Sequence, residues 1–137
     1  MANFVAYDEC LQVGFARDGL LLIEAVDREG TMNVIVERMD SKRFCLTFKK
    51  VLFSSRSELD SFERTAGEGH LFDWNEVSAN FGELFDSRLM TLFSPRSDVS
   101  PASCRHFFLA TYDDVFNIIA ESVTVGPVSA APPGNTL

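Results

Sequence analysis

Turn-forming residues recur through the first half of the chain at intervals of roughly ten to twelve residues, the spacing of strands in an antiparallel sheet. The tetrapeptides at residues 16–19, 27–30 and 39–42 read ARDG, DREG and MDSK, and they are rich in Gly, Asp and Ser. These residues form turns readily because they tolerate unusual backbone angles or bond to their own backbone. The first half is therefore predicted to be a strand meander.

The segments that follow the last two turns alternate between apolar and polar residues. Because side chains on a strand point to opposite faces in turn, such alternation indicates strands with one buried face. The positions expected to face inward are Met32, Val34 and Val36 in one segment and Phe44, Leu46 and Phe48 in the other.

The period changes after residue 54, where two helix-start signals appear. Ser55-x-x-Glu58 and Asp73-x-x-Glu76 both fit a capping box, and Val77, Phe81 and Leu84 follow the second at helical spacing. We therefore expect an α+β fold, in which an antiparallel twisted sheet or partly closed barrel has one or two short helices inserted around residues 55–85. An up-and-down barrel around an apolar ligand is the alternative fold.

The last third starts with a Pro/Ser-rich loop at residues 94–101 and continues with a predicted strand at 105–111. Residues 115–124 form either its hairpin partner across residues 112–114 or a short helix capped by Asp113 or Asp114. Their β-branched and aromatic side chains favour the hairpin. Residues 126–137 contain three Pro and little apolar surface, so we expect a globular domain over 1–125 and a disordered tail over 126–137.

The chain has 137 residues and a net charge of −8, which fits one acidic domain. A surplus of acidic residues argues against nucleic acid as the partner, because Lys and Arg must supply attraction to phosphates. No apolar run approaches the roughly 20 residues of a membrane-spanning helix, and the N-terminus has no basic-then-apolar leader pattern. The expected location is therefore the cytoplasm, with no membrane partner; the oligomeric state is left open.

Catalytic and cofactor motifs are absent from the sequence: it contains no phosphate-binding glycine loop, no nucleophile elbow and no zinc-protease helix motif. The three cysteines, Cys10, Cys45 and Cys104, are widely spaced and are expected to be free thiols. Cys104 and His106 would share one strand face, but a third metal ligand is lacking, and His70 follows Gly67 and Gly69 in an acidic stretch. We therefore predict no metal, no cofactor and no enzymatic activity.

The acidic surplus is concentrated in residues 57–87, which contain eight acidic residues and one Arg. The same segment holds Trp74 and four Phe residues, so it is expected to fold rather than to remain a solvated tail. Carboxylates steer the approach of a basic protein, and a large aromatic side chain can anchor it. The candidate partner-binding residues are Glu58, Asp60, Glu63, Trp74, Glu76 and Glu83.

Part of the C-terminal third resembles a pattern found in small uncharacterised bacterial proteins. The matching residues are Leu92-Phe93-Ser94, the Pro/Ser loop, and the segment HFFLATYDDVFNIIA at 106–120. Some of these proteins are of the toxin-neutralising, immunity type, which is what the resemblance implies here. Asn117 stands where the pattern has an acidic residue, so no functional residue is carried over.

Two main functional hypotheses follow. The first is a non-enzymatic acidic binding protein, in the form of an immunity-type inhibitor of a basic toxin or nuclease. The alternative is a carrier of an apolar small molecule, because 13 Phe residues can line a cavity as well as fill a core. An enzyme that uses His70 or His106 is the third hypothesis.

Overall fold

The computed structural model describes residues 3–6, 19–58, 79–85, 87, 89–92 and 103–128. These residues form strands and one short 3-10 helix, and none of them belongs to a helix long and apolar enough to span a membrane. The strands are β1 (Asn3–Ala6), β2 (Leu20–Arg28), β3 (Thr31–Arg38), β4 (Arg43–Lys49), β5 (Phe53–Glu58), β6 (Phe81–Phe85), β7 (Arg105–Ala110), β8 (Asp114–Ala120) and β9 (Ser122–Val128), and the 3-10 helix is η2 (Leu89–Leu92).

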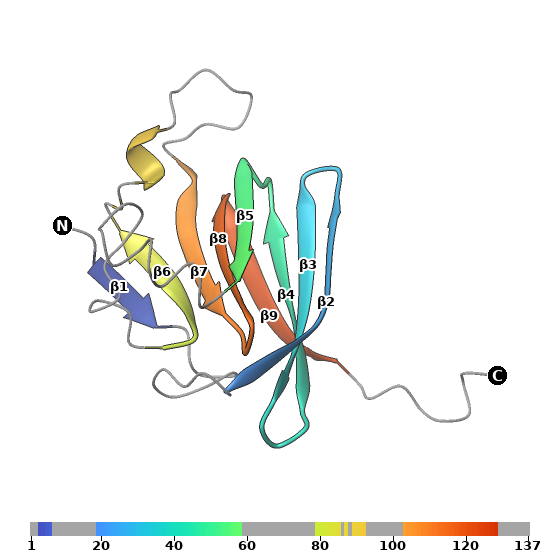
Figure 1. The fold of residues 1–137 in the computed structure, drawn as a ribbon. Coiled ribbons are helices and arrows are strands. Elements are labelled where there is room, and N and C mark those ends of the chain that lie inside the picture. Colours follow the sequence, from blue (N-terminus) through green and yellow to red (C-terminus); the bar gives the residue numbers. More distant parts are fainter. Residues whose placement is uncertain are drawn as a thin grey trace.

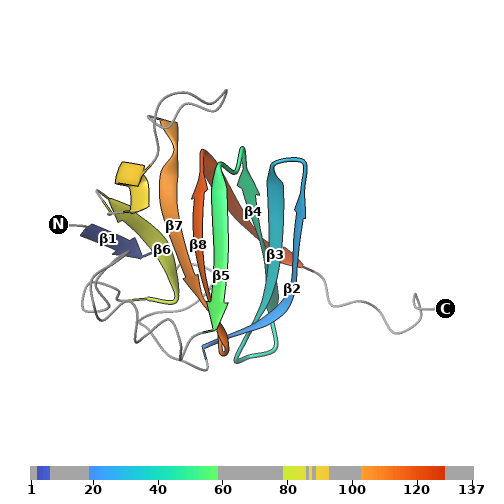
Figure 2. The ribbon, with the colours of Figure 1, turned by 45° about the horizontal axis from the view of Figure 1, so that its top comes forward.

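The strands form two antiparallel sheets. Sheet I has the strand order β1-β6-β7-β8-β5, and sheet II has the order β2-β3-β4-β9. Figures 1 and 2 show β1 and β2 on opposite sides of the row of strands. The order within sheet II confirms the predicted meander for residues 20–49, because β2, β3 and β4 follow one another in sequence and in space.

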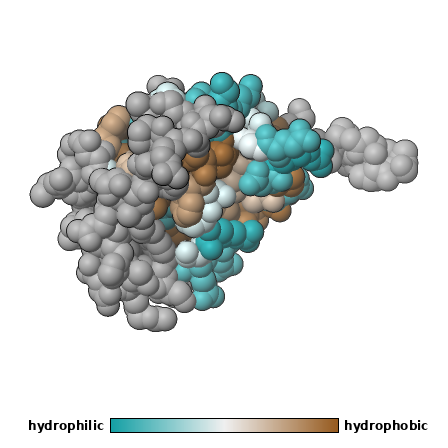
Figure 3. Space-filling view, turned by 90° about the horizontal axis from the view of Figure 1, so that it is seen from above, coloured by the Kyte–Doolittle hydropathy of each residue, from teal (hydrophilic) through white to brown (hydrophobic). Residues whose placement is uncertain are grey.

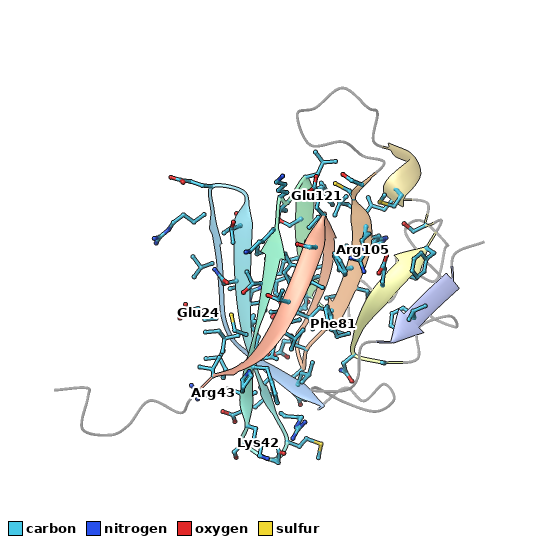
Figure 4. All side chains as sticks on the ribbon, turned by 180° about the vertical axis from the view of Figure 1, so that it is seen from behind. Glu24, Lys42, Arg43, Phe81, Arg105 and Glu121 are labelled. Carbon is cyan, nitrogen blue, oxygen red and sulfur yellow. The ribbon has the colours of Figure 1, made fainter. Side chains whose placement is uncertain are left out.

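The main core lies between the two sheets. Phe48 of β4 is fully buried, and its ring centroid lies 6.2 Å from that of Phe81 and 5.6 Å from that of Phe107, both in sheet I. Figure 4 shows Phe81 in this interior position. The six positions predicted to face inward are all buried in this core, namely Met32, Val34, Val36, Phe44, Leu46 and Phe48. The predicted register of β3 and β4 is therefore confirmed.

Two bent stretches of the chain, β4–β5 and β8–β9, each pass from one sheet to the other at the same corner. β4 continues into β5 through residues 50–52, and β8 continues into β9 through Glu121. Backbone hydrogen bonds cross this corner, from Leu52 N to Ile119 O (2.7 Å) and from Glu121 N to Lys49 O (3.0 Å). Lys50 adopts a left-handed backbone conformation with φ 55°, which turns the chain between the sheets. The ladder thus passes from one sheet to the other with its backbone bonds satisfied.

The α+β prediction is wrong. The described residues contain no α-helix, and the two sheets are not closed into a barrel, which also removes the up-and-down barrel alternative. Ser55 and Glu58, interpreted as a capping box, lie in β5, where they pair with Asn117 and Asp114 of β8. Long-range pairing has overridden the local helix signal.

The second expected helix is replaced at its end by strand β6. Phe81, Gly82, Glu83 and Leu84 are all buried, so the strand shows no alternation and its apolar spacing imitates a helix. Gly82 is required here by close approach. A Cβ on Gly82 would lie 2.4 Å from the Phe4 ring and 2.5 Å from the carbonyl oxygen of Val5. The start of this expected helix, near Asp73 and Glu76, lies outside the described residues.

The predicted C-terminal hairpin is confirmed. β7 and β8 pair antiparallel, with Ala110 opposite Val115, and the chain then bends at Glu121 into β9. β9 continues to Val128 and pairs with β4, three residues beyond the boundary expected at 125. Residues 129–137 of the expected tail lie outside the described part.

We predict that Phe48→Asp and Leu46→Asp each lower the free energy of unfolding by more than about 4 kcal/mol, because each places an unpaired carboxylate in the core. Lys49→Asp, at an exposed position of the same strand, is the control and should change it by less than about 0.5 kcal/mol. Urea denaturation measures all three. Equal unfolding midpoints for the core variants and the control would contradict the assigned inward face.

We also predict that Gly82→Ala destabilises the fold by about 1–3 kcal/mol, because the new methyl group overpacks against Phe4 and the Val5 backbone. Gly126→Ala is the matched control, since a Cβ there meets no atom within 4 Å. Thermal denaturation of both variants gives the comparison. A Gly82→Ala variant as stable as Gly126→Ala would show that β1 does not approach β6 this closely.

Candidate functional site

Sheet I buries polar side chains on the face turned away from sheet II. This face is buried around β7 and β8, where Phe108, Ala110 and Ile119 have no exposed surface. Polar groups at such depth are costly unless they are hydrogen-bonded, so their pairing shows what they do. The buried polar residues of the described part are Asn80, Ser87, His106, Thr111 and Asn117, together with Glu83, which lies on the other face of sheet I beside Phe81 and Phe107.

Three of these residues form a connected network. His106 Nδ1 lies 2.6 Å from Ser87 Oγ, and His106 Nε2 lies 2.7 Å from Asn117 Oδ1. The amide oxygen of Asn117 can only accept, so Nε2 carries the proton and donates, and Nδ1 accepts from the Ser87 hydroxyl. Ser87 Oγ in turn accepts from the backbone N–H of Met90, at 3.3 Å, in η2. The network therefore ties η2 to the middle of sheet I.

The roles in this network follow the order of hydroxyl, base and orienting group found in nucleophilic catalysis. However, Ser87, His106 and Asn117 each have no exposed surface, so a substrate has no access to the hydroxyl in this structure. Asn117 Nδ2 is also buried and has no hydrogen-bond partner among the residues that the structure describes. The network therefore has a structural role. Its one unsatisfied donor, Asn117 Nδ2, lowers the free energy of unfolding.

Burial lowers the pKa of His106 to about 4, against a partial opposing effect of its hydrogen bond to Asn117 and the charge of Glu83. The imidazole is therefore neutral at neutral pH, which its accepting Nδ1 requires. His106 lies in an interior strand of sheet I, because β7 lies between β6 and β8.

Glu83, a predicted partner-binding residue, lies in the interior. Its side chain is 3% exposed and binds Arg105, with Nη2–Oε1 at 2.8 Å and Nε–Oε2 at 3.1 Å. Arg105 also lies over the Phe107 ring, 5.1 Å from its centroid. Removing Arg105 would leave the carboxylate of Glu83 buried and unpaired, so the structure places Glu83 in a stabilising ion pair.

The other predicted partner-binding residues are distributed differently. Glu58 is exposed at the end of β5. Asp60, Glu63, Trp74 and Glu76 lie outside the described residues, as does most of the acidic segment. Sequence reasoning did not single out Ser87 or Asn117. A usable signal existed, because Asn117 interrupts the apolar run Val115–Ile119 and the predicted hairpin brings it diagonally across from His106.

An apolar depression lies on the surface where β2 and β3 meet the β7–β8 turn. It has a volume of about 300 Å³ and is lined by Leu21, Met39 and Tyr112 together with Glu37 and Arg38. The three apolar side chains are 44%, 68% and 45% exposed. The backbone N–H of Tyr112 donates to Leu20 O at 2.8 Å and holds the turn against β2.

Both charged residues that line the depression form ion pairs with residues close to it. Glu37 accepts from Arg43 Nε at 2.9 Å, and Arg38 binds both carboxylate oxygens of Asp40. Hydrogen bonding from Arg38 lowers the pKa of Asp40 to about 2, so this carboxylate stays ionised. Most residues that line the depression are thus apolar, and its two charged residues are neutralised by nearby ion-pair partners, as at the centre of a binding surface.

The opposite end of sheet II, which carries the β2–β3 turn, has a mostly hydrophilic surface (Figure 3). Figure 3 views the molecule from this end. Exposed apolar residues in contiguous patches mark interaction sites more often than single ones do. The depression at residues 21, 39 and 112 is therefore the candidate binding surface of the described part.

The described residues contain no group of three or more His, Cys, Asp and Glu side chains that could hold a metal ion. Cys45 and Cys104 are free thiols, whereas Cys10 and His70 lie outside the described part. Cys104 packs against Leu89 and Ile119, and burial raises the pKa of its thiol. Both ring nitrogens of His106 are used by Ser87 and Asn117, so this pair does not supply two metal ligands.

Comparison with protein-family models, with curated proteins and with solved structures finds no match to this chain. The functional argument therefore depends on the residues themselves.

We predict that His106 makes the fold sensitive to acid. Its pKa is about 4 in the folded chain and near 6.5 in the unfolded chain, so the unfolded state takes up the proton first as the pH falls between these values. Stability should therefore decrease by about 3 kcal/mol from pH 6.5 to pH 4 through this residue. His106→Gln removes the titration, so the stability difference between the wild type and this variant should shrink over that range in urea denaturation. Parallel pH profiles of the two proteins would contradict the assignment.

Proposed function

We propose that this chain is a non-enzymatic binding protein that docks on a basic protein. The observation that carries the proposal is the acidic surplus of residues 57–87, eight acidic residues against one basic. Because Glu83 is paired with Arg105, the surplus that can act on a partner comes from the remaining carboxylates of the segment. Long-range attraction from such a surplus raises association rates and favours partners of opposite charge.

The described structure supports a binding role in two ways. Its candidate surface is an apolar depression with exposed Leu21, Met39 and Tyr112, which suits the desolvated centre of an interface. The hydroxyl–imidazole–amide network of Ser87, His106 and Asn117 is buried away from solvent and has a structural role. In addition, Trp74 is proposed as an aromatic anchor within the acidic segment.

The C-terminal resemblance to immunity-type proteins gives the proposal its specific form, an inhibitor of a basic toxin or nuclease. The carrier hypothesis receives less support, because Phe48, Phe81 and Phe107 lie in contact between the sheets, as in a packed core. The test is binding of the purified chain to each basic product of the neighbouring genes, at low and at high salt. A complex with such a protein that weakens as salt increases supports the proposal, and the absence of any complex contradicts it.

We predict that the triple variant Glu58→Gln, Asp60→Asn, Glu63→Gln lowers the association rate with that basic partner and flattens its salt dependence. Rim charges act mainly on the encounter, through a field that salt screens within about 8–10 Å. The melting temperature and the dissociation rate should stay close to wild type, as stopped-flow kinetics and calorimetry can show. Unchanged association kinetics would remove these carboxylates from the interface. The control is Glu29→Gln, at an exposed turn outside the segment.

A further inference from the structure

The edges of the two sheets differ in how well they could accept another strand. The edge strands are β1 and β5 in sheet I and β2 and β9 in sheet II. β1 has four residues, β9 contains Pro127, and the β5 side chain Arg56 is held by Asp114. β2 has nine residues and no proline, so it offers the longest edge of the described strands, with one β-bulge between Leu22 and Glu24.

The backbone of β2 is open along this edge. Leu20 O accepts from Tyr112 N, so the polar groups of Leu20 point away from β3, and those of Leu22 follow because alternate residues point the same way. Among the described residues, no other backbone group bonds to this edge. The side chains of Leu21 and Ile23 are 44% and 40% exposed, next to the depression at Met39 and Tyr112.

The charges of β2 select the kind of strand that fits. Glu24, Asp27 and Arg28 are exposed, and Glu24 and Asp27 lie on opposite faces of the strand. Neither carboxylate has an ion pair within the described part of the chain. Figure 4 shows Glu24 at the outer border of sheet II. Opposite charges on adjacent strands stabilise their pairing, so an added strand with Lys or Arg facing these carboxylates is favoured.

A second copy of β2 fits poorly. The antiparallel register that sets Leu22 against Val26 and Ile23 against Ala25 also sets Glu24 against Glu24. Like charges directly opposite each other destabilise a pair of strands. A second copy is therefore disfavoured in this register, and the carboxylates of β2 favour a basic segment of a different protein as the occupant.

We propose that β2 accepts an extended basic segment of a partner protein as an added strand of sheet II. Backbone hydrogen bonds to the open edge would hold the segment, Glu24 and Asp27 would pair with its cationic side chains, and an apolar side chain would enter the depression at Leu21, Met39 and Tyr112. This inference rests on the proposed function, since it specifies how a basic partner is held.

The test uses the full chain and a synthetic peptide as long as β2, in which Lys alternates with Val, and a second peptide with Glu in place of Lys. Amide hydrogen exchange followed by NMR should show slower exchange at Leu22 on adding the Lys peptide, and no change at Leu46 in the central strand β4. The Glu peptide should not slow exchange at Leu22. Protection at β1, β5 or β9 instead, or shifts at Tyr112 without protection of Leu22, would overturn strand addition at β2.

Charge reversal distinguishes the edge from the general acidic field. Glu24→Lys should weaken binding of the Lys peptide by roughly fivefold, whereas Glu29→Lys, an equal charge change at an exposed turn position beyond the end of β2, should have little effect. Equal weakening by both variants, or no binding of the Lys peptide to the wild type, would overturn the inference. Neither result contradicts the proposed function, which is decided separately by binding to the whole basic partner.

Discussion

The fold depends on the corner at which two strand pairs pass from one sheet to the other. Lys49 and Leu52 on one side, and Ile119 and Glu121 on the other, keep backbone hydrogen bonds across the bend. Without these bonds, each sheet would end in an unpaired edge near the core, and burying such groups is costly. Because β4 and β8 belong to different sheets but are joined through this corner, their apolar faces meet, and Phe48 comes to lie against Phe81 and Phe107.

The two sheets have different environments, which separates stability from recognition. Sheet I has buried residues on both faces and holds its polar groups in fixed pairs, such as His106 with Asn117 and Glu83 with Arg105. Sheet II has one face in the core, and its edge strand β2 keeps exposed apolar and acidic side chains. A rigid double-sided sheet behind an accessible edge is a suitable support for a binding surface, because the surface needs no rearrangement before it meets a partner.

The sequence predicted the strands that have one solvent-exposed face and one buried face. Alternation was clear in β3 and β4, and the register at Val34 and Leu46 followed directly from it. β6 could not be predicted in this way, because Phe81, Gly82, Glu83 and Leu84 are all buried and leave no alternation. The capping pattern at Ser55 was equally uninformative, since pairing with β8, which is distant in the sequence, decided the structure there.

The candidate site was only partly accessible to sequence reasoning. Charge composition indicated an acidic binding protein, but it could not show that Glu83 is buried and neutralised by Arg105, because that pairing joins β6 and β7 in space. The exposed residue Leu21 was similarly indistinguishable from a core residue, since burial at the start of β2 depends on the position of the β7–β8 turn.

The pairing of β4 with β9 has a consequence for how the chain is made. Phe44 and Leu46 pair with Pro127 and Val125, so a central strand of sheet II receives its second neighbour only from residues synthesised much later. Until β9 leaves the ribosome, β4 is an edge strand with Phe-rich sides, which is a template for association with other nascent chains. Contacts of such long sequence range also form slowly. The protein therefore passes through a period in which β2, β3 and β4 have to remain soluble as an incomplete sheet.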